Sequence, residues 1–210
     1  MKLLRSGFLL FAALLCGIAK ASPESDFWTW FQKSDNMLFD FETDQEAVFD
    51  QLAAKMHQVD ARLTFEFGPK KQGRREFVIS ADGNRDAFPM VEKLYAAAPH
   101  LARWNVIKFR PRREPFDISY GGVTVKAQTV SAFVRRDGGK AAIAVLIPGY
   151  TKARHNEYAM IAFLLLDQAL GEYDVETRIG GVDVTAPSAR YPKTTPLKDL
   201  PKSVDAVLAH

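Results

Sequence analysis

Two spacings of apolar residues divide the chain into expected strands and helices. Residues 63–67 alternate strictly between apolar and polar, which predicts a half-buried strand, and residues 76–80 predict a second strand that returns beside it. Apolar residues at helical spacing predict a helix over about residues 86–98, with Pro89 tolerated in its first turn. A third strand is expected at residues 104–109.

The second half of the chain repeats this order. Residues 130–134 and 141–147 predict two strands around a glycine-rich turn, and residues 156–170 predict the helix that follows. Residues 173–179 are interpreted as the next strand, which ends at a pair of glycines. Nine consecutive apolar residues occupy the middle of the helix, so we expect it to be buried on all sides.

The order strand–strand–helix–strand therefore occurs twice, at residues 63–109 and 130–179. Hairpins followed by a crossover helix are typical of an α+β fold with a mixed or antiparallel sheet and packed helices. Two ferredoxin-like ββαβ halves are one form of that fold. We expect residues 22–113 and 114–210 to form these halves and to pack as one compact unit.

The first 21 residues have the pattern of a signal peptide. Lys2 and Arg5 precede a 12-residue apolar run, and Ala19 and Ala21 fit the small-residue cleavage rule, with the cut before Ser22. The run is shorter than the roughly 20 residues that span a bilayer. An uncleaved membrane anchor is the alternative. We expect an extracytoplasmic protein, periplasmic or secreted, that has no membrane contact after cleavage.

Removing this leader changes the composition. The chain has 28 basic and 25 acidic residues, but three of the basic residues lie in the leader, so the body is neutral. The one cysteine, Cys16, also lies there, which excludes a disulfide, a thiolate nucleophile and a cysteine metal site from the body. The four histidines have no second histidine or cysteine at metal spacing, so we expect neither a metal nor another cofactor.

Charge is uneven along the body. Residues 24–66 contain ten acidic and three basic side chains, whereas residues 70–113 contain eleven basic and four acidic ones. The basic stretch alone would suggest a nucleic-acid surface, but the neutral body and the leader argue against it. We expect the two stretches to be solvated or to neutralise each other in part, and we expect no nucleic-acid partner.

The candidate functional residues lie at two junctions where a strand leads into the following helix. The junction in the second half, residues 150–157, contains more of them. Free backbone N–H groups at a helix start favour an anion, which basic side chains there would hold. His155 is placed to move a proton near neutral pH, and Glu157 to orient it or act as a base. The favoured interpretation is a helix capped by Asn156, with Glu157 in its first turn and solvated charges around it. The candidate ligand-binding residues of this junction are Tyr150, Lys152, Arg154 and Asn156.

The first-half junction, residues 80–86, contributes Ser80, Asn84 and Arg85 as candidate ligand-binding residues. Ser80 has no histidine near it in sequence, which weakens a nucleophile role. A turn capped by Asp or Asn is the favoured interpretation. If the two halves are related, both junctions are expected at equivalent edges of one sheet.

A pair of carboxylates, Asp167 and Glu172, flanks the end of the expected helix at residues 156–170. Two neighbouring carboxylates are able to divide acid and base roles between them. Termination of the helix, with ion pairs to Arg178 or Lys126, is the favoured interpretation of these residues.

Three stretches resemble a group of uncharacterised bacterial exported proteins: FVISADGN, FPMVEKLYAAAPHLARWNVIKFRPR and LLLDQALGEYDVETRIGG. The likeness covers about half of the body and concerns structural features. It implies that Pro99 ends a helix, that Trp104 packs in the interior and that Gly171 closes another helix. No activity follows from this resemblance, and no catalytic residue is implied by it.

These observations favour an exported soluble protein that acts by binding, either a small anionic ligand or another protein. The alternative is an extracytoplasmic hydrolase acting on an anionic substrate, with His155 and Glu157 as its acid–base pair. That alternative requires Arg154, His155 and Glu157 to meet residues 80–84 in one cleft. The sequence alone leaves open whether the protein is an enzyme.

Overall fold

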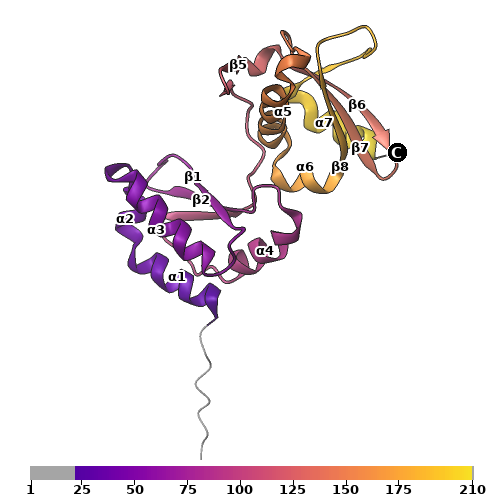
Figure 1. Cartoon of the computed structure of the whole chain (residues 1–210). Coiled ribbons are helices and arrows are strands. Elements are labelled where there is room, and N and C mark those ends of the chain that lie inside the picture. The colour runs from indigo at the N-terminus through magenta and orange to yellow at the C-terminus, as the bar shows by residue number, and fades with distance from the viewer. Residues whose placement is uncertain (1–21, 210) are drawn as a thin grey trace, which may run out of the picture.

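The computed structural model describes residues 22–209, which form an α+β protein with two lobes (Figure 1). The expected leader lies outside the described residues. Within them, no helix is long and apolar enough to cross a membrane. The helices are α1 (Pro23–Lys33), α2 (Asp35–Phe39), α3 (Gln45–His57), α4 (Phe88–Ala96), α5 (His155–Leu170), α6 (Glu172–Arg178) and α7 (Leu200–Leu208). The strands are β1 (Thr64–Phe67), β2 (Arg75–Ser80), β3 (Trp104–Lys108), β4 (Ile118–Tyr120), β5 (Val123–Val125), β6 (Ser131–Asp137), β7 (Lys140–Leu146), β8 (Ile179–Thr185) and β9 (Thr195–Pro196).

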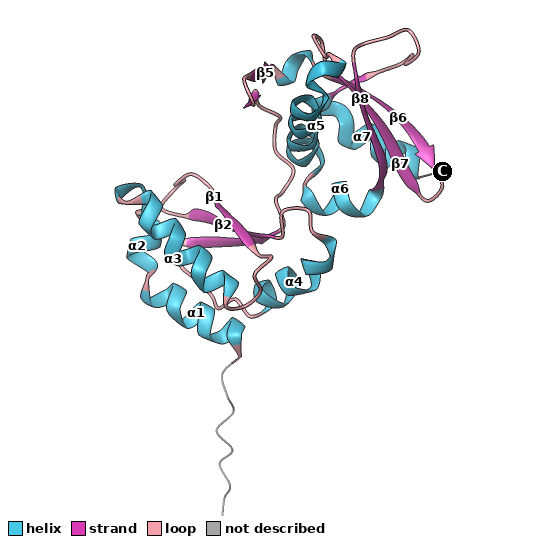
Figure 2. Cartoon of the chain, in the orientation of Figure 1, coloured by secondary structure: helices cyan, strands magenta, loops and turns pink. Residues whose placement is uncertain are grey.

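The first lobe is a three-stranded sheet with helices on one face (Figure 2). β1 and β2 form the expected antiparallel hairpin, and α4 carries the chain back so that β3 pairs parallel with β2. Phe31, Phe77 and Trp104 are buried between the sheet and the helices, with the rings of Phe31 and Phe77 4.8 Å apart. The alternate side chains of β1 and β2, including Glu66 and Glu76, belong to the opposite face.

The second lobe has a four-stranded sheet in the order β8-β7-β6-β9. β6 and β7 are antiparallel, and β8 returns parallel to β7 after α5 and α6. Ile143 and Val145 of β7 pack into the same core as Ile161 and Leu165 of α5. The ββαβ order is thus repeated, but the two crossovers of a ferredoxin-like sheet are not confirmed in either lobe, because each has only one.

Three parts of the sequence-based interpretation are wrong. The expected strand at residues 173–179 is instead the helix α6, because Gly171 ends α5 at φ 82° and Glu172 and Asp174 suit the first turn of a new helix. The glycine pair at which that strand was expected to end, Gly180 and Gly181, lies inside β8. The two strand–helix junctions also belong to different sheets, since β2 and β7 do not share one.

The acidic and basic stretches of the sequence neutralise each other in part, as expected. Their side chains meet across the first lobe because the acidic helices pack on the sheet that the basic stretch builds. The buried Arg75, for example, pairs with Glu42 and lies over the ring of Phe41, 4.4 Å from its centre. Other pairs join Lys70 to Asp40, Lys93 to Glu24 and Arg103 to Asp35.

Candidate functional site

The second-half junction lies between β7 and α5. A single 3-10 turn, Lys152–Arg154, leads directly into α5, which begins at His155. Asn156 is therefore inside the first helical turn and does not cap the helix, which corrects the prediction. Lys152, His155 and Asn156 are all exposed.

The charges of this junction are engaged within the chain. Arg154 pairs with Glu157 at 3.2 Å and donates a hydrogen bond to the carbonyl of Gly121, which holds the β4–β5 hairpin against the start of α5. The hydroxyl of Tyr150 and Nδ1 of His155 lie 2.9 Å apart. A backbone hydrogen bond, with help from Arg154, lowers the pKa of Glu157. A carboxylate with a lowered pKa is a weaker general base.

Backbone donors are also fewer at this junction than the sequence suggests. Pro148 has no N–H group, and the N–H of Ile147 donates to the carbonyl of Thr185 at 2.9 Å. The N–H of Tyr150 closes the turn on the carbonyl of Ile147 at 3.2 Å. The N–H groups of Ile147 and Tyr150 are therefore not available to an anion.

The first-half junction forms the capped turn that its sequence favours. Oγ of Ser80 accepts a hydrogen bond from the N–H of Asp82 at 3.0 Å, and Oδ1 of Asn84 accepts one from the N–H of Asp86 at 3.2 Å. Arg85 is exposed. These contacts are the Asx and Ser turns typical of such residues, and they occupy Ser80 and Asn84, two of the three side chains that were candidates for ligand binding.

The backbone of this first junction binds an anion, and the anion is a side chain of the second lobe. Asp82 and Gly83 have positive φ angles of 51° and 75°, which turn neighbouring N–H groups toward one point. Oε1 of Glu172 accepts hydrogen bonds from Ala81 and Gly83 at 3.0 and 3.1 Å. Its Oε2 accepts one from the N–H of Arg110 at 3.1 Å. Glu172 is fully buried and joins the two lobes.

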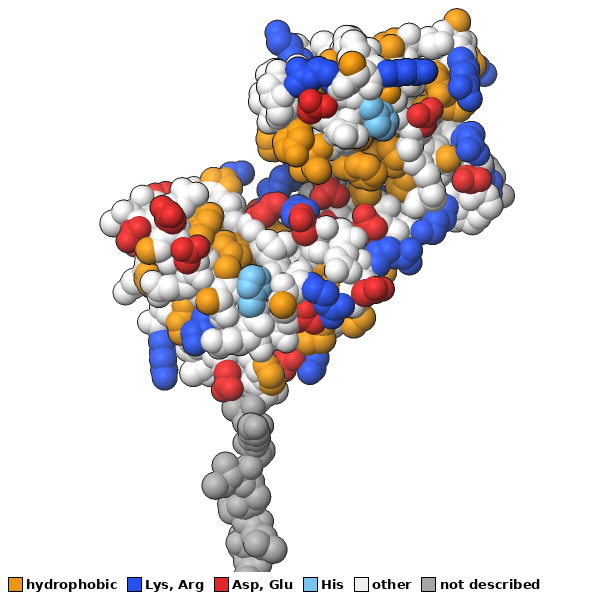
Figure 3. Space-filling model, viewed as in Figure 1, with side chains coloured by type: hydrophobic (Ala, Val, Ile, Leu, Met, Phe, Trp, Pro, Cys, Tyr) orange, Lys and Arg blue, Asp and Glu red, His pale blue; other side chains and the backbone are white. Residues whose placement is uncertain are grey.

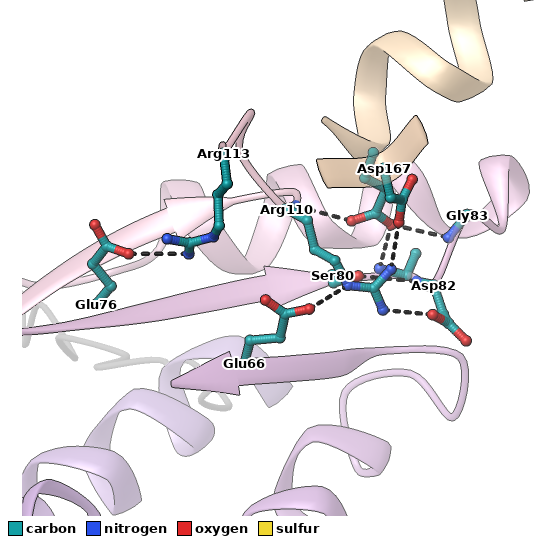
Figure 4. Close-up of polar contacts among 10 residues, drawn as sticks. Glu66, Glu76, Ser80, Asp82, Gly83, Arg110, Arg113 and Asp167 are labelled. Atoms are coloured by element: carbon teal, nitrogen blue, oxygen red, sulfur yellow. Dashed lines mark hydrogen bonds and ion pairs between the residues drawn. The ribbon is translucent and has the colours of Figure 1, made fainter. Parts of the chain in front are cut away.

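Arg110 makes a second connection between the lobes (Figure 4). Its Nε lies 2.6 Å from Glu66 of β1, and its Nη1 donates to Asp167 of α5 at 2.9 Å. Its Nη2 donates to Asp82, so one guanidinium serves three carboxylates. Arg110 lies two residues after the end of β3, and its contact with Glu66 places its side chain beside the face of the first sheet that the helices leave uncovered.

Burial changes the protonation of one carboxyl group in this connection. Burial raises the pKa of Asp167 to about 6, although the charge and hydrogen bond of Arg110 act in the opposite direction. Burial alone would lower the pKa of Arg110, but the hydrogen bond and charge of Asp82 raise it above its ordinary value. Arg110 therefore stays charged, whereas Asp167 changes its charge near pH 6.

The two junctions lie at opposite ends of α5. Residues 80–83 contact Glu172, which follows the last turn of α5, whereas His155 is the first residue of that helix. A helix of 16 residues is about 24 Å long. Residues 80–84 therefore do not meet His155 and Glu157, and the shared cleft that the hydrolase alternative requires is not formed.

α5 has an exposed apolar face, which corrects the prediction that it is buried on all sides. Met160, Phe163 and Leu164 are 43%, 49% and 38% exposed. Their spacing of three and four residues places them on one side of the helix, while Ile161 and Leu165 are buried in the core. Figure 3 shows hydrophobic side chains gathered on the side of the second lobe that faces the first lobe.

This apolar face extends into a hollow between the lobes. Phe116 is 59% exposed, and its N–H donates to the side chain of Gln168 at 2.8 Å, which holds it beside α5. Phe116 and Leu164 line a hollow of about 280 Å³, and Glu66 and Arg110 contribute charged groups to the same lining. We call Phe116, Met160, Phe163 and Leu164 together the α5 face.

Sequence reasoning did not find these features. Asp167 and Glu172 stood out as a carboxylate pair, but Asp167 pairs with Arg110 and Glu172 with backbone N–H groups, not with Arg178 or Lys126. The one signal for the α5 face was the length of the apolar run. A helix that buries one stripe needs apolar residues at only about half of nine consecutive positions, so the remaining apolar residues face another direction.

No protein-family model matches the chain, and no curated protein or solved structure is significantly similar to it. Within residues 22–209, no group of three or more His, Cys, Asp or Glu side chains is arranged to hold a metal ion. Function is therefore inferred from the α5 face and from the charged groups between the lobes.

Proposed function

We propose that the protein is an exported, non-catalytic module that binds a segment of another protein between its lobes. The binding segment combines apolar anchor residues, which contact the α5 face, with basic side chains, which face the carboxylates around Arg110. The observation that carries this proposal is the exposed α5 face itself. Export is supported by the signal-peptide pattern of residues 1–21.

The α5 face is unusual for a surface that meets only water. A soluble protein normally exposes large apolar side chains singly, and contiguous groups of them commonly mark a binding surface. Met160, Phe163 and Leu164 are adjacent on one helix. Phe116 lies near Leu164, because both side chains line the same hollow. Burying such a group contributes about 1.5–3 kcal/mol for each fully covered side chain.

The charges beside the α5 face indicate which segment would fit. Three carboxylates, Glu66, Asp82 and Asp167, share the guanidinium of Arg110. Of these three carboxylates, Asp82 and Glu66 are the more exposed to solvent, with side chains 75% and 42% exposed. A partner with Lys or Arg next to its apolar anchors would reduce this surplus negative charge, and such complementarity favours correct pairing over other partners.

The test is selection of peptides from a random displayed library on the purified body of the protein. The expected winners combine Leu, Phe or Trp with Lys or Arg. Fluorescence anisotropy of the best peptide should then show that Phe163→Ser weakens binding at least about tenfold, since apolar anchors at the centre of an interface dominate its affinity. Tyr95→Ser is the matched control, because Tyr95 is a 39% exposed aromatic residue on α4.

Two results would contradict the proposal. One is selected peptides that are acidic, or that bind Phe163→Ser as tightly as the unaltered protein. The other is a stable dimer in light scattering that Phe163→Ser dissociates, because a second copy would then cover the α5 face. For export, N-terminal sequencing of the native product should begin at Ser22, and a product that begins at Met1 in the cytosol would refute it.

A further inference from the structure

In the part of the chain that the structure describes, one face of the second lobe's sheet is not covered by a helix. α5 and α7 pack on the face that includes Ile143 and Val145. Residues 186–194 leave β8 at one edge of this sheet and return as β9 at the other edge. We call residues 186–194 the strap. Its Tyr191 contacts the uncovered face, because its hydroxyl donates to Asp183 of β8 at 2.9 Å.

A hollow of about 290 Å³ lies between the strap and this face. Its lining includes three of the smallest residues that a strand can contain, Ala142 and Ala144 of β7 and Gly181 of β8. Ala142 of the inner strand β7 pairs with Gly181 of the edge strand β8, so two adjacent strands carry small residues side by side. A cavity of about 150 Å³ is enough for a benzene-sized ring, and this hollow is larger.

Aromatic rings and arginines complete the lining. The rings of Phe133 and Tyr191 are 5.6 Å apart and tilted by 49°. The guanidinium of Arg190 lies over the ring of Tyr191, 5.4 Å from its centre. Among the described residues, no carboxylate lies within ion-pair distance of Arg190, and Arg135 has only Asp137, at 3.6 Å. The other carboxylate of the lining, that of Asp183, already accepts the hydroxyl of Tyr191.

From this geometry we propose that the hollow under the strap binds a small aromatic carboxylate. The ring of the ligand lies on the low floor at Ala144 and packs against Phe133 and Tyr191, where two aromatic rings favour tilted or offset contacts with a third. The carboxylate of the ligand pairs with Arg190, which presents several N–H donors in one plane. This site is separate from the α5 face, which lies on the opposite side of the same sheet.

The test uses 3-phenylpropionate and the full mature chain, with calorimetry and amide chemical shifts as readouts. Binding with a Kd of about 1 mM or tighter is expected, with the largest shifts at Ala144 and Gly181. Propionate lacks the ring and phenethylamine lacks the carboxylate, so both should bind at least about tenfold more weakly. Ala144→Leu fills the floor and Arg190→Gln removes the charge, and each should weaken binding about tenfold. Lys202→Gln, an equal change of charge on α7, should leave binding unchanged.

Several outcomes would overturn this inference. These are no shift at Ala144 or Gly181 with 3-phenylpropionate at about 10 mM, equal binding of propionate or phenethylamine, and unchanged binding by Arg190→Gln. Ala144→Leu replaces a buried residue and is interpreted only if its melting temperature matches that of the unaltered protein. Arg190→Gln alters an exposed side chain, so it decides the question if Ala144→Leu does not fold.

Discussion

Single residues decide how the two lobes are held together. Glu172 is a fully buried carboxylate, and a buried charge is tolerated only where hydrogen bonds replace its lost hydration. It receives those bonds from Ala81, Gly83 and Arg110, all of which lie on the other lobe. The turn at residues 80–84 thus uses its backbone to hold a group of the same chain, which explains why its side chains form local caps.

We therefore expect Glu172→Gln to lower the free energy of unfolding by about 2 kcal/mol or more. The glutamine has one acceptor oxygen, and its NH₂ group would oppose a backbone N–H that now donates to the carboxylate. Urea titration measures the change. Glu176→Gln, one turn later on α6, is the matched control and should cost less than about 0.5 kcal/mol. Equal losses in the two variants would argue against a special role for Glu172.

At the level of elements, the passage from α5 to α6 depends on one glycine. Gly171 has φ 82°, and a Cβ there would lie 3.0 Å from the carbonyl oxygen of Arg110 and 3.1 Å from the N–H nitrogen of Arg112. The segment after β3 therefore packs against the backbone of this passage. A β-carbon would be strained by its dihedral angle and would also push the lobes apart.

Gly171→Ala is expected to destabilise the protein by about 2–3 kcal/mol, because strain at positive φ and the steric contact add together. Gly138→Ala separates the two effects, since Gly138 has φ 61° but no atom within 4 Å of the added carbon. It should cost only about 1 kcal/mol. Thermal unfolding of both variants gives the comparison, and equal losses would show that the contact with Arg110 and Arg112 contributes nothing.

The arrangement of elements around α5 also explains why one face of this helix is exposed. The helix packs on the sheet through one side, and residues 113–118 pass along another side, with the N–H of Arg113 donating to the carbonyl of Gln168 at 2.6 Å. No further layer lies over Met160 and Phe163 in the described residues. An apolar helix is buried on all sides only when elements surround it, and this fold supplies too few of them.

At the level of the whole molecule, two separate cores are joined by polar contacts and by the ring of Tyr173 on α6, whose centre lies 5.1 Å from that of Phe109 in the first lobe. One core contains Phe77 and Trp104, and the other contains Ile143 and Leu165. Between them, the described contacts include the carboxylates held by Arg110 and by backbone N–H groups. Ionic connections of this kind depend on pH, because protonation removes the charge of a carboxylate.

The raised pKa of Asp167 determines in which direction the stability of the fold changes with pH. Its pKa is about 6 in the folded protein and 3.8 in a free chain, so between these values the folded state binds more protons. Its protonated form therefore stabilises the fold fully below about pH 4, and that contribution is lost as the pH rises through 6. Asp167→Asn, which is neutral throughout, should be more stable than the unaltered protein at pH 7.5 by up to about 2 kcal/mol.

Urea unfolding at pH 7.5 and at pH 4 tests this expectation. The advantage of Asp167→Asn should shrink toward zero at the lower pH, because Asp167 is then protonated as well. Asn156→Ser, at an exposed position of α5 without an ionisable group, should show a difference that does not change with pH. An advantage of Asp167→Asn that grows as the pH falls would contradict a raised pKa at this carboxyl group.

The sequence by itself determined the kinds of elements and most of their order. Alternation at residues 63–67 and 76–80 identified the first hairpin, and Pro89 located the start of the following helix. These signals are local, because the spacing of apolar residues reflects the period of a strand or helix. The one misassigned element, α6, is short and carries both aromatic and β-branched residues, so its spacing fits a strand as well.

Only the tertiary structure decided which groups meet. Glu172 lies 91 residues from Ala81 and 62 from Arg110 along the chain, and no local pattern records such a pairing. The uncovered face of α5 and the hollow under residues 186–194 have the same origin, because the exposure of a side chain depends on the layers around its element. Periodicity shows which face of an element is apolar, but only packing determines whether anything covers that face.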